Sequence, residues 1–169
     1  MNEMTLDQVL TKHHKDNAIV DVDEPTVKLV VFALGNDWFA FHGNHIREIL
    51  AQVDVFFVPG CPPSIEGVIN VRGDIESVIR PRELLGLPDS GAYTCSSVLL
   101  GRGGGVSSGV RVDRVIDVID APQSSVQPPP ATLPERMRLL ALGVVHFQEH
   151  LVIVLNIDTM FAEFSRGLG

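Results

Sequence analysis

Short apolar runs separated by turn-forming residues make up most of this chain. The runs are rich in β-branched and aromatic residues, and clusters of Gly, Pro, Asn and Asp lie between them, which is typical of short strands joined by tight turns. This pattern predicts strands over residues 27–34, 38–41, 53–58, 97–100 and 108–120, a hairpin over 67–79, and a final hairpin from 139–147 and 151–155.

Helical spacing is confined to a few short stretches. One short helix is predicted after an N-cap at Asn44, with Ile46, Ile49 and Leu50 on one face. Two others are predicted from Pro81 to Gly86 and over residues 157–164. Residues 121–138 are rich in proline and are predicted to be irregular. Many short strands with small peripheral helices indicate an all-β barrel or sandwich. The segments 29–41 and 97–112 share a strand-turn-strand pattern, which hints at two similar small barrels.

The hairpin over 67–79 contains the most informative motif of the chain. Gly67 opens an apolar run in which Asn70 and Arg72 alternate with valine, so both polar side chains are expected on one face of a strand. Gly73 and Asp74 are expected to form the turn. Arg72 would then be either a structural anchor for the turn or a docking residue.

Residues 1–25 are expected to be a separate acidic tail, and residues 26–166 the folded domain. Residues 5–8 fit a capping box, so a short helix is possible before a solvated linker, and we expect the barrels to fold without this tail. The N-terminus has neither the basic nor the apolar region of a secretory signal. No run approaches the roughly 20 apolar residues of a membrane span, so a cytoplasmic protein that does not insert into membranes is expected.

Net charge argues against a nucleic-acid partner. The 169 residues contain 13 Lys and Arg against 21 Asp and Glu, for a net charge of −8, whereas a phosphate backbone is bound by clustered basic residues. The two cysteines, Cys61 and Cys95, lie far apart and predict neither a disulfide framework nor a metal site.

The candidate chemistry of the remaining residues is weak. The glycine-rich loop 101–105 lies between two predicted strands and lacks the Gly-Lys-Ser/Thr that opens a helix in a phosphate-binding loop. The six histidines do not have metal-ligand spacing, and Asp113, Asp117 and Asp120 are expected on the solvent face of a strand. We therefore expect no cofactor, no metal and no enzyme activity, with a small nucleotide-binding barrel as the alternative of a different class.

Several motifs together resemble the CheW family of chemotaxis coupling proteins. They are Trp-Phe-Ala-Phe at 38–41, His-Ile-Arg-Glu-Ile at 45–49, Ile-Glu-Gly-Val-Ile-Asn-Val-Arg-Gly at 65–73, Gly-Val-Arg-Val-Asp-Arg-Val-Ile-Asp-Val at 109–118, and Leu-Val-Ile-Val-Leu-Asn-Ile-Asp at 151–158. The resemblance implies two five-stranded SH3-like barrels packed on a shared core. It also implies a non-enzymatic adaptor that couples a transmembrane chemoreceptor to the regulatory domain of a CheA-type histidine kinase.

The resemblance also suggests which residues bind partners. Those that match the family pattern are Gly67, Asn70, Arg72 and Gly73 of the hairpin, with Ile46 and Glu48 of the preceding segment. For Ile46, packing in the core is an alternative to a place in an interface.

One stretch departs from the family pattern. Residues 77–82 read Ser-Val-Ile-Arg-Pro-Arg, where the family usually has Pro-Val-Ile-Asp-Leu-Arg, so Arg80 reverses a charge. Arg80 is a candidate determinant of partner choice, or it simply precedes the short helix that follows. The departure leaves open a divergent paralogue that serves a chemosensory pathway other than motility.

Overall fold

The computed structural model describes residues 24–88 and 97–168. The tail 1–23 and Cys95 lie outside these residues. The strands and helices, in chain order, are β1 (Thr26–Leu34), β2 (Asp37–His42), η1 (Gly43–His45), β3 (Ile46–Ala51), β4 (Ile65–Val71), β5 (Asp74–Ile79), α2 (Pro81–Leu85), β6 (Ser97–Gly103), β7 (Val106–Val112), β8 (Arg114–Pro122), η2 (Gln123–Ser125), α3 (Glu135–Leu140), β9 (Ala141–Phe147), β10 (His150–Leu155) and α4 (Ile157–Leu168).

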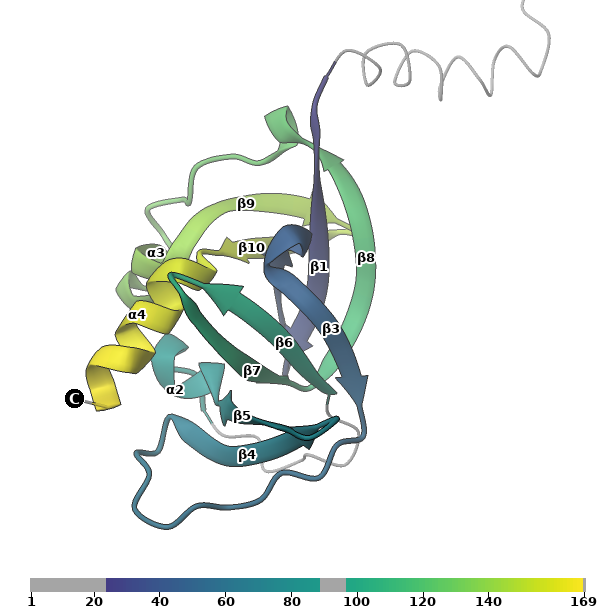
Figure 1. Ribbon diagram of the computed structural model, residues 1–169. Helices are drawn as coiled ribbons and strands as arrows, with labels where there is room; N and C mark the ends of the chain where they lie inside the picture. Colours follow the sequence, from purple (N-terminus) through teal and green to yellow (C-terminus); the bar gives the residue numbers. More distant parts are fainter. Residues whose placement is uncertain (1–23, 89–96, 169) are drawn as a thin grey trace, which may run out of the picture.

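The strands form two five-stranded sheets that curl into small barrels, which confirms the expected all-β class (Figure 1). Barrel 1 has the strand order β8-β1-β2-β10-β9, and barrel 2 has the order β3-β6-β7-β5-β4. Barrel 2 uses one continuous stretch of chain, whereas barrel 1 combines β1 and β2 with the last three strands. Helices α2, α3 and α4 lie at one side of the barrels (Figure 1).

The strand order also reveals an internal repeat. Each barrel consists of a hairpin, β1–β2 or β6–β7, and a three-strand unit, β8–β10 or β3–β5. The second strand of the hairpin pairs in parallel with the last strand of the unit. These pairs are β2 with β10 in barrel 1 and β7 with β5 in barrel 2. Each three-strand unit comes from the other half of the chain. The similarity seen in the sequence between 29–41 and 97–112 therefore corresponds to equivalent hairpins, β1–β2 and β6–β7.

Three apolar clusters hold these strands together. One fills barrel 1, one fills barrel 2, and the largest lies between them and includes Phe32, Phe39, Phe41 and Phe161. Strand β1 is buried on both faces: Leu29 and Val31 point into barrel 1, and the residues that alternate with them belong to the shared cluster. This continuous apolar strand could be predicted from its sequence, because a two-sided burial removes the polar positions.

Equivalent glycines lie where each barrel closes. A Cβ on Gly67 would lie 2.2 Å from the Phe56 carbonyl oxygen, and a Cβ on Gly143 would lie 2.6 Å from that of Gln127. Phe56 forms an antiparallel bridge with Val68, the residue after Gly67, and Gln127 forms one with Val144, the residue after Gly143. Glycine is therefore required at both positions by the close approach of a neighbouring backbone.

Two ion pairs are almost buried, and the first of them lies where the barrels meet. Arg82 of α2 donates to Asp113 Oδ2 over 2.5 Å, and Asp113 Oδ2 also accepts from the amide of Gly35 over 2.6 Å. Arg111 makes a bidentate pair with Glu66 over 2.9 and 2.5 Å. The expectation that Asp113 lies on a solvent-facing strand was wrong, because it lies at the corner between β7 and β8 and its side chain is only 19% exposed.

Three other expectations needed correction. The helix predicted after Asn44 is wrong, because η1 ends at His45 and the chain then pairs with β6 as strand β3. Residues 53–58 do not form a strand, and only Phe56 makes a bridge. The proline-rich segment 121–138 contains the start of α3, which the periodicity missed. Among the described residues, no helix is both long and apolar enough to cross a membrane.

Candidate docking surface

The tip of the β4–β5 hairpin is a two-residue turn centred on Arg72 and Gly73. Their φ angles are 52° and 95°, which is the pattern of a type I′ turn. The expected turn at Gly73 and Asp74 is therefore displaced by one residue, and Arg72 does not lie on the strand beside Asn70. The Asn70 side chain instead closes the turn, since its Oδ1 accepts the Gly73 amide over 2.8 Å.

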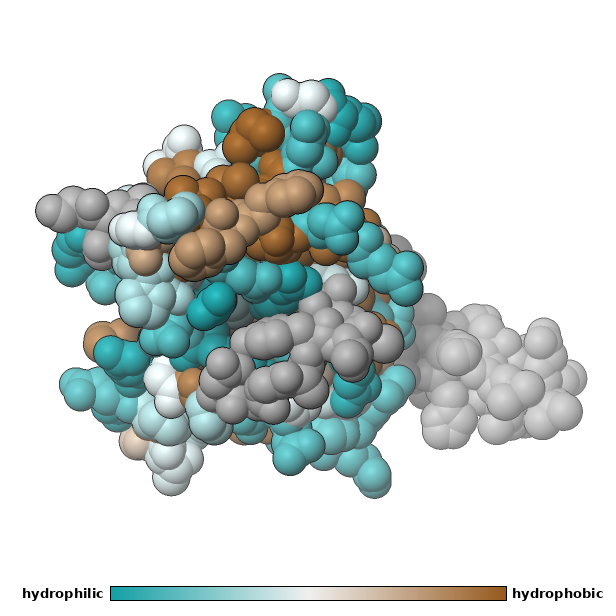
Figure 2. Space-filling view, turned by 90° about the horizontal axis from the view of Figure 1, so that it is seen from below, coloured by the Kyte–Doolittle hydropathy of each residue, from teal (hydrophilic) through white to brown (hydrophobic). Residues whose placement is uncertain are grey.

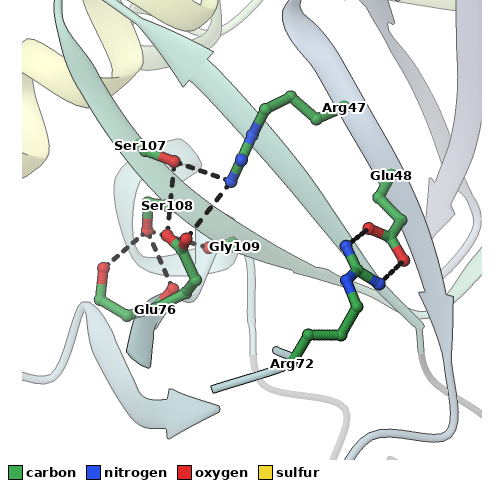
Figure 3. Close-up of polar contacts among 8 residues, drawn as sticks. Arg47, Glu48, Arg72, Glu76, Ser107, Ser108 and Gly109 are labelled. Atoms are coloured by element: carbon green, nitrogen blue, oxygen red, sulfur yellow. Dashed lines mark hydrogen bonds and ion pairs between the residues drawn. The ribbon is translucent and has the colours of Figure 1, made fainter. Parts of the chain in front are cut away.

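Arg72 makes a bidentate ion pair with Glu48 of β3. The two guanidinium nitrogens donate to the two carboxylate oxygens over 3.0 and 2.6 Å (Figure 3). This hydrogen bonding lowers the pKa of Glu48 below its usual value and raises that of Arg72. The Arg72 side chain remains 73% exposed, so its charge is presented to solvent. Arg72 is anchored by a carboxylate on another strand, rather than by the turn carbonyls.

An arginine is an unusual choice for the first central position of this turn. The left-handed region costs an L-residue with a Cβ about 1 kcal/mol, and Gly, Asn or Asp normally occupies it. An exposed ion pair returns at most a similar amount. Stability alone therefore does not favour arginine here, and backbone strain that stability does not explain points to function.

A second polar network lies beside this pair (Figure 3). Arg47 of β3 donates to Ser107 over 3.0 Å and pairs with Glu76 of β5 over 3.4 Å, and Ser107 donates to the other Glu76 oxygen over 3.3 Å. The Glu76 side chain is 17% exposed. These contacts join β3, β5 and β7, so the strand that carries Glu48 is held at a fixed distance from the hairpin.

The outer face of the hairpin carries exposed apolar side chains. Val68 of β4 is paired with Phe56 on one side and with Ser77 of β5 on the other. Two residues further along β4, Asn70 is paired with Ile75. Paired residues and residues two apart on one strand share a face, so all five side chains lie on this face. Ile75 is 65% exposed, and Phe56 and the adjacent Phe57 are 60% and 75% exposed. Figure 2 shows an apolar band bordered by polar residues on the side of the molecule where β4 and β5 lie. An exposed apolar strip of this kind is typical of a protein-binding surface.

The other predicted site residues lie elsewhere. Ile46 packs against the shared cluster, which favours core packing for this residue. Gly67 is buried beneath Phe56 and offers no side chain. Arg80 lies at the opposite end of the hairpin from its tip, because Ile65 and Ile79 form the last pair of the β4–β5 register. Its Nε is buried and lacks a hydrogen-bond partner in the described part of the chain.

Sequence reasoning missed Phe57 and Arg47 as parts of this surface. The doublet Phe56-Phe57 was assigned to a strand, and strands usually bury one of two adjacent residues. Two adjacent aromatic residues before a proline-rich turn are the signal that could have identified an exposed loop.

The glycine-rich loop does not form a phosphate-binding geometry. Gly101 and Gly103 lie within β6, and only Gly104 and Gly105, with φ of 57° and 80°, form the turn. A Cβ on Gly103 would lie 2.6 Å from Asp158 Oδ1, so a carboxylate lies against this end of the strand. In the described ranges, no group of three His, Cys, Asp or Glu residues could hold a metal ion.

Comparisons with known proteins agree with this architecture. The family model described as CheW-like domain matches residues 28–165. The chain is 28% identical to the chemotaxis protein CheW of Treponema pallidum, over 90% of this chain and 91% of the relative. It is 25% identical to the chemotaxis protein CheW of Thermotoga maritima, over 82% and 89%.

A solved structure supports the same assignment. The crystal structure of the scaffolding protein TtCheW from Thermoanaerobacter tengcongensis has a TM-score of 0.72 and 27% sequence identity, and the match covers 80% of this chain and 88% of that chain. Because the family model spans most of the sequence and both barrels, the chain belongs to the CheW family.

Proposed function

We propose that this protein is a non-enzymatic adaptor of chemotaxis signalling that couples a transmembrane chemoreceptor to a CheA-type histidine kinase. The observation that carries the proposal is the strained hairpin tip, at which Arg72 presents its charge beside an apolar outer face. The relatives' names, chemotaxis protein and scaffolding protein, support a role in assembly rather than in catalysis. The adaptor works in the cytoplasm and reaches receptor arrays through its protein partners.

The surface has the composition that a docking site needs. Apolar side chains such as Phe57 and Ile75 remove area from water on binding, and Asn70 and Arg72 at the border fix the register of the partner. Removing one charge from a buried interfacial pair typically costs about 2–5 kcal/mol of binding energy. Arg72 is therefore expected to contribute more to binding than to folding.

A charge-swap experiment separates these two roles. The variants are Arg72→Glu, Glu48→Arg and the double variant, and the partners are the purified regulatory domain of the kinase and the cytoplasmic tip of the receptor. The double variant restores the ion pair with reversed polarity. We expect both single variants and the double variant to remain folded. The Arg72→Glu variant and the double variant are expected to bind at least one partner with an affinity at least about 30-fold lower than that of the wild type.

The outcome that contradicts the docking role is a double variant that binds both partners as tightly as the wild type. Arg72 would then matter only as one half of an ion pair. A Phe57→Ser variant tests the apolar strip independently, since its side chain is 75% exposed and its loss is expected to weaken binding while leaving stability almost unchanged. Binding of both partners at wild-type affinity by all these variants would refute the proposed surface.

Arg80 tests whether the pathway is a divergent one. It lines a small cavity together with Arg82, Arg111 and Asp113, so three guanidinium groups share this cavity with one carboxylate. Arg80→Asp is expected to leave the protein at least as stable as the wild type. If Arg80 sets partner choice, the same variant changes the ranking of affinities across a panel of paralogous kinases and receptors, and an unchanged ranking assigns Arg80 to structure alone.

A further inference from the structure

Two buried polar atoms lie at one small cavity where the barrels meet. In the described part of the chain, Arg80 Nε and Asp113 Oδ1 are the buried side-chain nitrogen and oxygen atoms that lack a hydrogen-bond partner. Both residues line the same cavity, whose other lining residues are Leu34, Pro81, Arg82 and Arg111. One atom is a donor and the other is an acceptor, so a single group that bridges them would satisfy both.

These two atoms are expensive to leave without partners. A buried polar atom has lost its hydration, and a charged group that makes no compensating hydrogen bond loses the most. Native proteins therefore pair nearly all their buried polar atoms, either with other protein atoms or with ordered water. Arg80 Nε and Asp113 Oδ1 do not pair with each other, which leaves an ordered molecule between them as the remaining solution.

The other charged groups at the cavity are already held by nearly buried contacts. Asp113 Oδ2 accepts from the Arg82 guanidinium over 2.5 Å and from the Gly35 amide over 2.6 Å. Arg111 makes its bidentate pair with Glu66. Neither arginine can turn toward Asp113 Oδ1 without breaking an ion pair, so the bridging group has to come from solution.

The size and polarity of the cavity select water as that group. The centre of a water molecule has about 10 Å³ available in this cavity, which corresponds to one water. Phosphate and chloride are larger, and Asp113 Oδ1 would repel any anion. A cation would lie against the guanidinium groups of Arg80, Arg82 and Arg111. Water, in contrast, accepts from a guanidinium N–H and donates to a carboxylate at the same time.

We propose that one water molecule occupies this cavity, where it accepts a hydrogen bond from Arg80 Nε and donates one to Asp113 Oδ1. Arg80 directly precedes α2, and Asp113 lies at the corner between β7 and β8. The Asp113 amide donates to the Ala33 carbonyl of β1 over 3.1 Å, so this corner is tied to barrel 1. The water therefore completes a polar joint between the two barrels and is a component of the fold.

The joint lies at the base of the hairpin whose tip carries Arg72. Strand β5 runs from Asp74, next to the tip, to Ile79, next to Arg80. The ion pair with Glu48 holds the tip against β3, and the water holds the base of the same hairpin against the corner that contacts barrel 1. The orientation of the hairpin relative to barrel 1 thus depends on a solvent molecule.

A crystal structure of the full-length protein, at a resolution that shows ordered water, tests the placement directly. One density peak is expected within hydrogen-bond distance of both Arg80 Nε and Asp113 Oδ1. Crystals soaked in sodium bromide distinguish water from an anion, because bromide is located by its anomalous scattering. A bromide peak at this position, a direct hydrogen bond between the two side chains, or the absence of density would overturn the proposal.

The variant Arg80→Lys provides a matched control in solution. Lysine keeps the positive charge but has a methylene in place of Nε, so it lacks the donor that holds the water. Oxygen-17 magnetic relaxation dispersion detects water molecules that stay bound for longer than the protein takes to rotate. The dispersion amplitude of the wild type is expected to exceed that of the variant by the contribution of one water. Equal amplitudes would overturn the assignment of Arg80 Nε as the donor.

Discussion

The ion pair between Arg82 and Asp113 provides the sharpest test of how the two barrels are joined. Their side chains are only 10% and 19% exposed, and the 2.5 Å contact connects α2 to the corner between β7 and β8. Asp113→Ala removes the carboxylate but leaves the Arg82 guanidinium in place. It also leaves the Gly35 amide without its acceptor.

The magnitude follows from the burial of these groups. Breaking a buried ion pair from one side typically costs about 3–5 kcal/mol, because the remaining charge has lost its partner. Arg82 keeps its hydrogen bond to the Pro88 carbonyl at 2.8 Å, which places the expected loss near the lower end of that range. With a urea m-value of about 2 kcal/mol/M, the midpoint of unfolding should fall by roughly 1.5 M.

Equilibrium unfolding in urea, followed by the fluorescence of Trp38, measures this change, and the double variant Arg82→Met/Asp113→Leu is its matched control. Replacing both charges by apolar groups of similar volume is often neutral or stabilising, so the double variant should unfold within about 1 kcal/mol of the wild type. A single variant that loses less than about 1 kcal/mol would refute the reasoning. The pair would then behave as a solvent-screened contact despite its burial.

Three further predictions follow from backbone and charge. Gly67→Ala should lower the free energy of unfolding by about 2 kcal/mol or more in a urea titration, since its Cβ would lie 2.2 Å from the Phe56 carbonyl oxygen. Arg72→Gly should change the unfolding free energy by less than about 1 kcal/mol, because relief of the left-handed strain offsets the lost contact with Glu48, and a larger loss would contradict the strain argument. Burial lowers the pKa of His42, so the unfolded state binds the proton more readily than the folded state does. The free energy of unfolding should therefore fall as the pH drops below about 6.5. His42→Gln should reduce that fall in thermal melts recorded across this pH range.

The hairpins of this fold could be predicted from local sequence, but one strand could not. Turns such as Gly104-Gly105 need positive φ, and glycine shows where such turns occur. Strand β3 was mistaken for a helix because Ile46, Ile49 and Leu50 have helical spacing. Pairing with β6, which includes an irregularity between Ile46 and Glu48, decided its structure, and this long-range contact leaves no local signal.

The candidate site was predictable only in part, for a similar reason. The Asn-x-Arg-Gly motif made Asn70, Arg72 and Gly73 candidates, but the ion-pair partner of Arg72 could not be derived without knowing that β3 lies across from the hairpin. Phe57 looked like part of a strand, and its exposure depends on which edge of barrel 2 remains uncovered. Residue identity indicates that a position is unusual, and tertiary structure determines what it contacts.

The arrangement of strands in the two barrels has a consequence for synthesis on the ribosome. Barrel 2 is complete once residues 46–112 have emerged, whereas the β1–β2 hairpin must wait for β8 and β10, which pair with β1 and β2 respectively. During that interval the face of β1 that points into barrel 1 cannot be buried in its final place, because Val145, Val152 and Val154 of that cluster are translated later. The first hairpin of the fold to be translated is thus among the last to join a complete sheet, and this delay makes the nascent hairpin a site for chaperone binding or for aggregation when elongation stalls.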